Sequence, residues 1–186
     1  DVGYGTVTLN ADGTVDFAPD ANWNGTESFD YTVSDGTDTA TATADITVDA
    51  VNDGPVATDD SATTAEDTTV NLDLTANDTD LEGESLSITQ IDGQDVSVGD
   101  SVDVGYGTVT LNADGTVDFA PDANWNGTES FDYTVSDGTD TATATADITV
   151  DAVNDGPVGV DDTATTNEDT TVNLDLTAND TDLEGE

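Results

Sequence analysis

The sequence predicts an all-β protein built from tandem antiparallel β-sandwich domains. Apolar and polar residues alternate over many short runs, no stretch has a helical period, and residues 1–51 recur letter for letter at 103–153. Strict alternation is typical of strands that bury one face. Short strands separated by Asn/Asp-Gly turn signals favour a sandwich.

The repeat predicts the domain organisation. Residues 52–84 recur at 154–186 with four substitutions, which gives a period of 102 residues. A unit of about 100 residues is a usual domain size. With the Asn-Asp-Gly-Pro turn as the junction, we expect the C-terminal half of one repeat at 1–51, a complete repeat at 52–153 and the N-terminal third of the next at 154–186.

Six runs of alternating apolar residues in the complete repeat predict strands, and we expect seven or eight strands in all. Turn signals such as NADG, SDG and IDG separate the runs. Their inward-facing positions are Val70, Leu72, Leu74, Leu86, Ile88, Val109, Leu111, Val117, Phe119, Phe131, Tyr133, Val135, Ala142, Ala144, Ala146, Ile148 and Val150.

The two tryptophans are predicted to anchor one end of each core. Trp125, and its copy Trp23, is large enough to bury much apolar area. A sugar-stacking surface is the alternative interpretation. The row of threonines at 39, 41 and 43 is the other hint of a ligand-binding module, although an exposed strand face explains it equally well.

The charge of the chain is unusual. It has 43 Asp and Glu but no Lys, Arg or His, so no side chains form ion pairs. Two carboxylates about 4 Å apart repel by roughly 4 kcal/mol at an effective dielectric near 20. Folding therefore requires bound cations, or concentrated salt as in a halophile. Binding to nucleic acid is disfavoured because phosphates are read by Lys and Arg.

The same composition argues against an enzyme. Without His, Lys, Arg or Cys the chain lacks the usual bases, nucleophiles and phosphate clamps. Paired carboxylates alone are a weak sign of glycoside hydrolysis. No run approaches the length of a membrane-spanning segment, so we expect no insertion into a membrane.

A cluster of oxygen-bearing side chains suggests a cation site. In NDTDLEGE, the spacing Asp78-x-Asp80-x-Glu82 places alternating oxygens on one side of a turn, and Gly83 allows tight folding. Such oxygens suit Ca²⁺. A solvated turn is the alternative, since Asp and Asn favour turns. The whole cluster comprises Asn77, Asp78, Asp80, Glu82 and Glu84, repeated as Asn179, Asp180, Asp182, Glu184 and Glu186.

The acidic cluster and the strands around it resemble a known family of repeats. The run TVSDGTDTATATADITVDAVNDGP, with the following EDTTV and NDTDLEGESLSI, is similar to the cadherin repeat pattern. The run FAPDANWNGTESFDYTVSDG looks like bacterial cadherin-like tandem repeats, which form extender regions of large secreted adhesins of the RTX type. The resemblance implies Ig-like Greek-key sandwiches with Ca²⁺ bound at the junctions between them.

Carried over to this chain, the resemblance implies two sets of Ca²⁺ ligands. The first junction would use Asn52, Asp53, Glu66 or Asp67, Asp78 and Asp80. The second would use Asn154, Asp155, Glu168 or Asp169, Asp180 and Asp182. Asp35 and its counterpart Asp137, from VSDG, would belong to a junction or to a site within a unit. Ala50 and Ala152 stand where cadherins usually carry an acidic residue, which leaves the number of ions open.

The resemblance implies a calcium-stabilised extracellular spacer whose partners are neighbouring identical repeats. Weak junction sites fill where Ca²⁺ is plentiful, as outside cells. A carbohydrate-binding or surface-binding module is one alternative. A self-assembling filament or surface-layer subunit, completed head-to-tail between chains, is another. We expect the ends to reflect trimming of a longer array; joined ends would lack the stretch equivalent to Ser85–Val102.

Overall fold

The computed structural model describes residues 1–182 and confirms the all-β class. The chain divides into two compact units, Asp1–Asn52 and a second unit that begins at Asp53. Each unit is described by itself. Within the described residues, no helix has the length and apolar character needed to cross a membrane.

The second unit contains the complete repeat, in which nine strands are described. β5, β8 and β9 lie outside the runs identified from alternation. The strands are β5 (Asp60–Ala65), β6 (Val70–Leu72), β7 (Ser87–Ile91), β8 (Gln94–Asp95), β9 (Ser101–Asp103), β10 (Gly107–Leu111), β11 (Val117–Pro121), β12 (Gly127–Ser136) and β13 (Thr141–Asp151).

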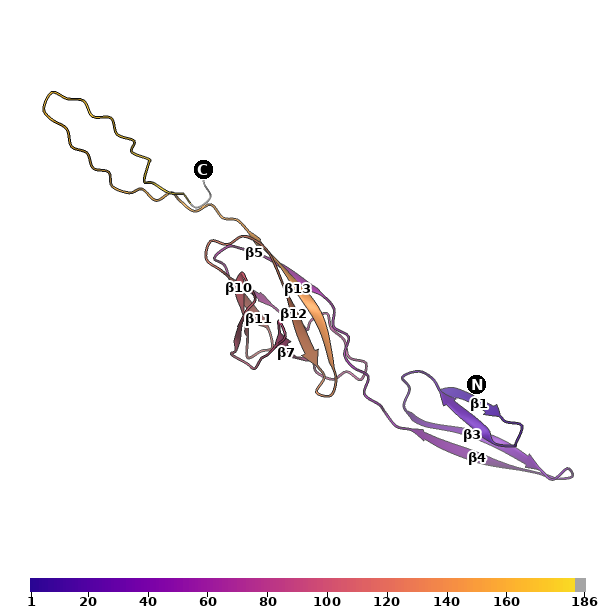
Figure 1. The fold of residues 1–186 in the computed structure, drawn as a ribbon. Helices are drawn as coiled ribbons and strands as arrows, with labels where there is room; N and C mark the ends of the chain where they lie inside the picture. The colour runs from indigo at the N-terminus through magenta and orange to yellow at the C-terminus, as the bar shows by residue number, and fades with distance from the viewer. Residues whose placement is uncertain (183–186) are drawn as a thin grey trace. The chain divides into compact units, whose positions relative to one another are not determined.

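Two sheets form the sandwich (Figure 1). Their strand orders are β6-β11-β10-β9 and β5-β13-β12-β7-β8. The alternating apolar residues meet between them, and the Phe119 and Phe131 rings stack with centroids 6.5 Å apart. Trp125 is partly buried against this core and stacks on Tyr106, with ring centroids 4.8 Å apart. The predicted inward positions thus form one core, as a two-layer domain requires.

One strand pair departs from the antiparallel pattern. β5 lies parallel to β13, with Asp60 beside Ala146 and Asp151 beside Ala65. A parallel pair needs a long connection between its strands, and here the rest of the repeat supplies it. The segment before β5 extends back along β13, because Asp59 Oδ1 accepts the N–H of Thr145 at 3.0 Å. The chain therefore enters the repeat beside the start of β13 and leaves after its end.

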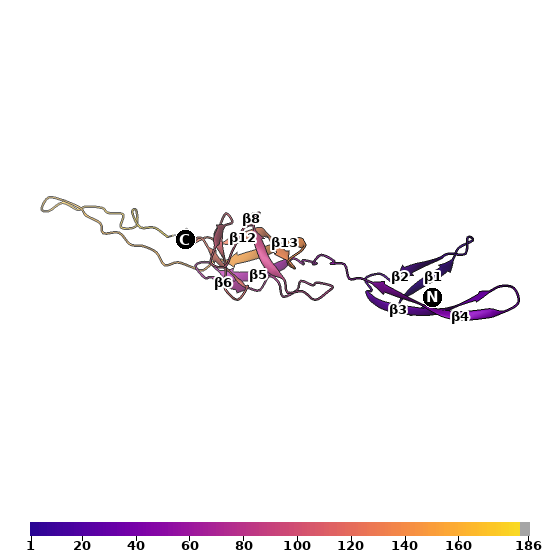
Figure 2. The ribbon, with the colours of Figure 1, turned by 90° about the horizontal axis from the view of Figure 1, so that it is seen from below.

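The first unit consists of two hairpins, β1-β2 and β3-β4. Both views draw them as separate layers (Figures 1 and 2). Their registers match those of β10-β11 and β12-β13 in the complete repeat, as the identical sequences demand. The strands are β1 (Gly5–Leu9), β2 (Val15–Pro19), β3 (Gly25–Ser34) and β4 (Thr39–Val48).

Residues 154–182 form an extended loop that runs out and back, drawn in yellow in Figure 1. Its described residues form a single isolated bridge, between Val158 and Thr181. The same bridge joins Val56 to Thr79 in the complete repeat. This bridge is therefore kept in the segment, whereas the described copies of β5 and β6, at 162–167 and 172–174, form no strand.

Candidate metal centres

A tight turn gathers three carboxylates at the N-terminal end of the complete repeat. Asp80 Oδ1 accepts the backbone N–H groups of Glu82, Gly83 and Glu84 at 3.0, 2.9 and 3.2 Å. Gly83 permits the turn because its φ is +82°. Carboxylate oxygens of Asp80, Glu82 and Glu84 all lie within 4.8 Å of one another. This arrangement concentrates negative charge around a small volume.

The electrostatics of this turn favour a neutralising cation. Hydrogen bonding with the carboxyl group of Asp80 raises the pKa of Glu84. Burial raises the pKa of the neighbouring Asp78, whose Oδ1 accepts the N–H of Thr58 at 2.8 Å. A raised carboxyl pKa means that the negative form is disfavoured there. A bound cation would reverse that preference.

Three buried carboxylate oxygens have no hydrogen-bond partner within the part of the chain that the structure describes. They are Oδ2 of Asp78, Asp80 and Asp155. Nearly all buried polar atoms in proteins are hydrogen-bonded, because an unpaired one costs free energy. All three atoms belong to residues that the resemblance assigns as Ca²⁺ ligands.

The linker contributes to the first cluster. The N–H of Asp53 is donated to Glu82 Oε2 at 3.1 Å. Gly54 lies against the β12-β13 turn, since a Cβ at this position would be 3.3 Å from Asp140 Cβ. Glu82 was predicted as part of the acidic cluster but was not among the ligands that the resemblance implies, and Asp140 was in neither set. Their proximity depends on tertiary packing, and Gly54 is the sequence signal for that close approach.

The two VSDG aspartates cap hairpin turns. Asp137 Oδ1 accepts the N–H groups of Thr139 and Asp140 at 2.6 and 2.7 Å. Asp35 makes the equivalent bonds in the first unit, and those backbone bonds, from Asp38 and then Thr37, lower its pKa. One oxygen of each of these two aspartates is therefore engaged in holding its turn.

Asn52, another predicted ligand, is the last residue of the first unit.

The structure places Glu66 apart from the group in which we expected it. Glu66 follows β5 and is only 4% exposed. Its backbone N–H is donated to the carbonyl of Asp151 at 2.9 Å, and its Oε1 accepts the N–H of Val153. Glu66 thus lies with the linker at 153–155. The reason is the parallel pairing, which brings the end of β5 to the end of β13.

Asp67 lies beside Glu66 in a different local role. It has a left-handed backbone, with φ +57°, and its Oδ1 accepts the N–H of Asn124 at 3.0 Å. Asn124 is also left-handed, with φ +56°. The contact joins the turn after β5 to the loop before β12. Asp67 therefore ties two turns together at this end of the repeat.

The remaining predicted ligands lie in the C-terminal segment. Asp180 Oδ1 accepts the N–H of Val160 at 2.8 Å, which repeats the bond between Thr58 and Asp78. The side chain of Asn154 donates to the carbonyl of Asp155 at 2.9 Å. Asp182 is half-buried, whereas Glu168 and Asp169 are exposed. Glu184 and Glu186 lie outside the described residues.

Family models match both units. One described as a bacterial cadherin-like domain matches residues 52–152, and one described as a cadherin-like domain matches residues 1–49. The chain belongs to the bacterial cadherin-like domain family. Such domains are typically extracellular or surface-associated and non-enzymatic, and they generally bind calcium. The chain is thus a cadherin-like repeat module with an acidic cluster that could hold a metal ion.

Similarity to solved structures is weaker. An endo-fucoidan hydrolase of glycoside hydrolase family 107 (the H294Q variant of MfFcnA4) is 27% identical, with a TM-score of 0.39, over 81% of this chain and 22% of that one. Sidekick-1 immunoglobulin domains 1–5 are 15% identical, with a TM-score of 0.34, over 79% and 29%. Domains 4 and 5 of the S-layer protein SbsC are 16% identical, with a TM-score of 0.34, over 77% and 65%.

The bacterial cadherin-like module spans about a quarter of the first fucoidan hydrolase chains it resembles. No curated protein matches its sequence.

Proposed function

We propose that this chain is a stretch of calcium-stabilised extender repeats from a large extracellular bacterial adhesin of the RTX type. One observation carries the proposal. The buried carboxylate oxygens without a hydrogen-bond partner in the described chain belong to Asp78, Asp80 and Asp155, which flank the linkers between repeats. With no Lys, Arg or His in the chain, a cation from solution is the available partner.

Two groups of residues would hold Ca²⁺ at the two ends of the repeat. Asp78, Asp80 and Glu82 would supply oxygens at the N-terminal end, together with Asn52 and Asp53 of the linker. Glu66 would supply oxygens at the C-terminal end, together with Asn154, Asp155, Asp180 and Asp182. Ca²⁺ takes six to eight oxygen ligands and accepts flexible carboxylates. The bound ion would neutralise the carboxylates and fix the linker to the sandwich.

The path of the chain supports a spacer. Because β5 and β13 are parallel, entry and exit lie at opposite ends of the sandwich. Repeats joined in this way add length with each copy. The sequence 1–51 recurs without a change at 103–153, which suits units that all perform the same task. The extender would hold a terminal binding domain away from the cell.

Thermal unfolding in Ca²⁺ tests the proposal. The melting temperature is measured as Ca²⁺ is added to the EDTA-treated chain, against NaCl at matched ionic strength. We expect a steep rise at millimolar Ca²⁺ that NaCl does not reproduce. Equal stabilisation by both salts would mean that the repulsion within the acidic clusters is relieved by general salt screening, and it would overturn the calcium mechanism.

A pair of matched variants localises the effect. Asp78→Asn with Asp80→Asn removes two charges from the proposed site and keeps both Oδ1 acceptors. Asp92→Asn with Asp122→Asn removes two exposed charges elsewhere. In EDTA the first variant should be at least as stable as the parent, since burial disfavours the Asp78 charge. In Ca²⁺ it alone should lose stabilisation, and equal behaviour of the two variants would exclude this site.

A further inference from the structure

Tyr106 is an exposed aromatic residue on a complete domain. Its side chain is 55% exposed, although the core of this repeat is closed between the two sheets. One face of its ring stacks on Trp125, with centroids 4.8 Å apart and planes 2° from parallel. Since Trp125 covers that face, the exposed area belongs to the opposite face and the edges of the Tyr106 ring. The pair therefore presents a flat aromatic surface to solvent, which we call the platform.

Backbone contacts fix the platform in place. The carbonyl of Tyr106 accepts the N–H of Asp122 at 3.0 Å, and the carbonyl of Asp122 accepts the N–H of Trp125 at 3.1 Å. Gly107 takes the inward position, where a Cβ would be 2.7 Å from the Phe119 ring. Because neighbouring residues of a strand face opposite sides, Tyr106 points outward. The ring therefore needs little further ordering when a ligand binds.

The same aromatic pair is built in the first unit. Tyr4 and Trp23 stack with centroids 5.0 Å apart and planes 5° from parallel. The N–H of Tyr4 is donated to Glu27 Oε2 at 3.0 Å. The bond from the N–H of Tyr106 to Glu129 Oε2, at 3.1 Å, is its counterpart. The platform is therefore a property of the local sequence, which each copy of that sequence carries.

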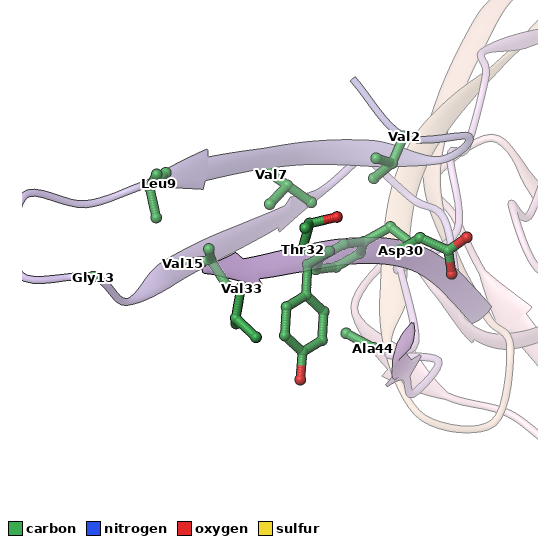
Figure 3. Close-up of a pocket in the computed structure, with 11 residues that line it drawn as sticks. Val2, Val7, Leu9, Gly13, Val15, Asp30, Thr32, Val33 and Ala44 are labelled. Atoms are coloured by element: carbon green, nitrogen blue, oxygen red, sulfur yellow. The ribbon is translucent and has the colours of Figure 1, made fainter. Parts of the chain in front are cut away.

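The apolar side chains of the first unit are a different case. Val7, Leu9 and Val15 line an open space of about 690 Å³ between its hairpins (Figure 3). Their copies in the complete repeat are core residues. Tyr106 differs from them because it lies outside the core of a complete domain.

Carboxylates lie beside the platform. Glu129 Oε2 accepts the N–H of Tyr106, and Asp103 Oδ1 accepts the N–H of Gly105 at 3.0 Å. A Cβ on Gly105 would lie 3.5 Å from Glu129 Oε2, so the Glu129 carboxylate is next to the turn that carries Tyr106. The chain has no Lys, Arg or His to pair with these groups. An anion would be repelled here, whereas a cation would be attracted by the carboxylates and by the negative face of the ring.

We infer that the platform binds the guanidinium group of an arginine side chain from a basic partner protein. A guanidinium is planar and weakly hydrated, stacks on aromatic faces and directs a fork of N–H donors at carboxylates. It would lie flat on the Tyr106 ring while Glu129 or Asp103 accepts its N–H groups. A lysine ammonium is a compact, strongly hydrated charge without a plane to stack. This docking point goes beyond the spacer role and does not depend on Ca²⁺ binding.

Nuclear magnetic resonance of the full chain tests the ligand class. The ring protons of Tyr106 are followed as blocked tripeptides with arginine, lysine or citrulline between two glycines are added. The buffer has about 0.15 M NaCl, where the Debye length is about 8 Å, with and without millimolar Ca²⁺. Arginine should shift these protons saturably and bind about two- to fivefold more tightly than lysine, the range of an exposed cation–π contact. Citrulline, which keeps the shape without the charge, should leave them unshifted. Lysine or citrulline that binds as tightly as arginine would overturn the proposal.

Matched variants locate the contact, with binding measured from the indole N–H signal of Trp125. Tyr106→Leu keeps an apolar cover on Trp125 but removes the outer ring, and it should abolish the preference for arginine over lysine. Tyr106→Phe keeps the ring and should keep that preference. Glu129→Gln retains an oxygen for the N–H of Tyr106 and removes one charge, so arginine should bind more weakly. Asp92→Asn, which removes one exposed charge elsewhere, should have no such effect. An unchanged preference in Tyr106→Leu would show that the ring is not the binding surface, and the proposal would fail.

A neutral sugar is the other occupant that could lie flat on a tyrosine ring. Cellotriose is therefore titrated under the same conditions, and the arginine titration is repeated in about 1 M NaCl, where the Debye length is about 3 Å. We expect the sugar to leave the Tyr106 protons unshifted and the higher salt to weaken arginine binding. Saturable binding of cellotriose that is unchanged by Glu129→Gln would identify a sugar site in place of a guanidinium site and overturn the proposal.

Discussion

The buried carboxylate of Glu66 accepts the backbone N–H of Val153, which lies 87 residues further along the chain. The bond joins the end of the first strand of the repeat to the linker that leads to the next one. A buried carboxylate is costly unless it is paired. A cation bound at the linker that follows would therefore neutralise the buried charge of Glu66.

Replacing Glu66 with Gln should weaken Ca²⁺ binding at this end of the repeat. The amide keeps an oxygen for the N–H of Val153 but loses the charge that attracts the ion. We expect the affinity of one class of sites to fall by about tenfold, which corresponds to about 1.4 kcal/mol. Isothermal titration calorimetry measures this change. Glu168→Gln, at the exposed copy of the position, is the control, and an equal effect of both substitutions would contradict the assignment.

Tyr133→Phe should destabilise the complete repeat. The Tyr133 hydroxyl donates to Asp60 Oδ2 at 2.8 Å and lies 2.9 Å from the carbonyl oxygen of Thr58. Its loss leaves a partly buried carboxylate without this donor, at a cost of about 1–3 kcal/mol. Urea unfolding monitored by tryptophan fluorescence measures the cost. The cost should shrink as pH falls through the raised pKa of Asp60, and a cost independent of pH would argue against this pairing.

Without Ca²⁺, the complete repeat should be most stable in mild acid. Burial raises the pKa of Asp60, with Tyr133 donating to it and with Asp78, Asp73 and Asp59 adding repulsion. A raised folded-state pKa gives stability that is present below the unfolded value and lost as pH rises through the folded value. Acidification from neutral pH should therefore raise the melting temperature in EDTA.

Stronger acid should reverse this trend. Hydrogen bonds from Thr116, the side-chain hydroxyl first, lower the pKa of Asp114. Its contribution is present above the unfolded value, about 3.9, and is lost as pH falls through the lower folded value. Melting curves between neutral pH and about pH 3 check both the expected rise and the expected fall of the melting temperature. A steady fall from neutral pH downward would contradict the expected rise.

Identical substitutions in two copies of one sequence should have different effects on the repeat. Leu74→Ala removes a fully buried side chain from the core and should cost about 2–5 kcal/mol. Leu176→Ala changes an exposed side chain of the same type and should leave the unfolding of the complete repeat unchanged. Denaturant unfolding of the two variants side by side measures both. Equal losses would mean that residues 154–182 stabilise the repeat directly.

Local patterns predicted much of the fold. Alternation placed Val109, Leu111, Phe119 and Tyr133 on buried faces, because a strand that packs on one side must repeat its apolar residues every second position. β8, of two residues, is too short to display any period. β5 was missed because its buried face carries Ala62 and Thr64 and lacks large apolar residues.

Contacts between residues far apart in the chain could not be predicted from the sequence. Asp80, Glu82 and Glu84 lie in one local turn, so their spacing alone placed them together. The position of Glu66 depends on β5 running parallel to β13, a tertiary choice that no local signal encodes. For the same reason, the hydrogen bond from Tyr133 to Asp60, across 73 residues, could not be foreseen.

The parallel pairing of β5 with β13 determines how the repeat responds to tension. A pull on the two ends of the repeat draws Asp60 and Asp151 in opposite directions along the strands, because the chain enters at one and leaves at the other. The six paired positions between these strands are then loaded in shear, all at once, and cannot open one after another. Flow or traction on an array of such units would be resisted by every repeat at its first and last strands.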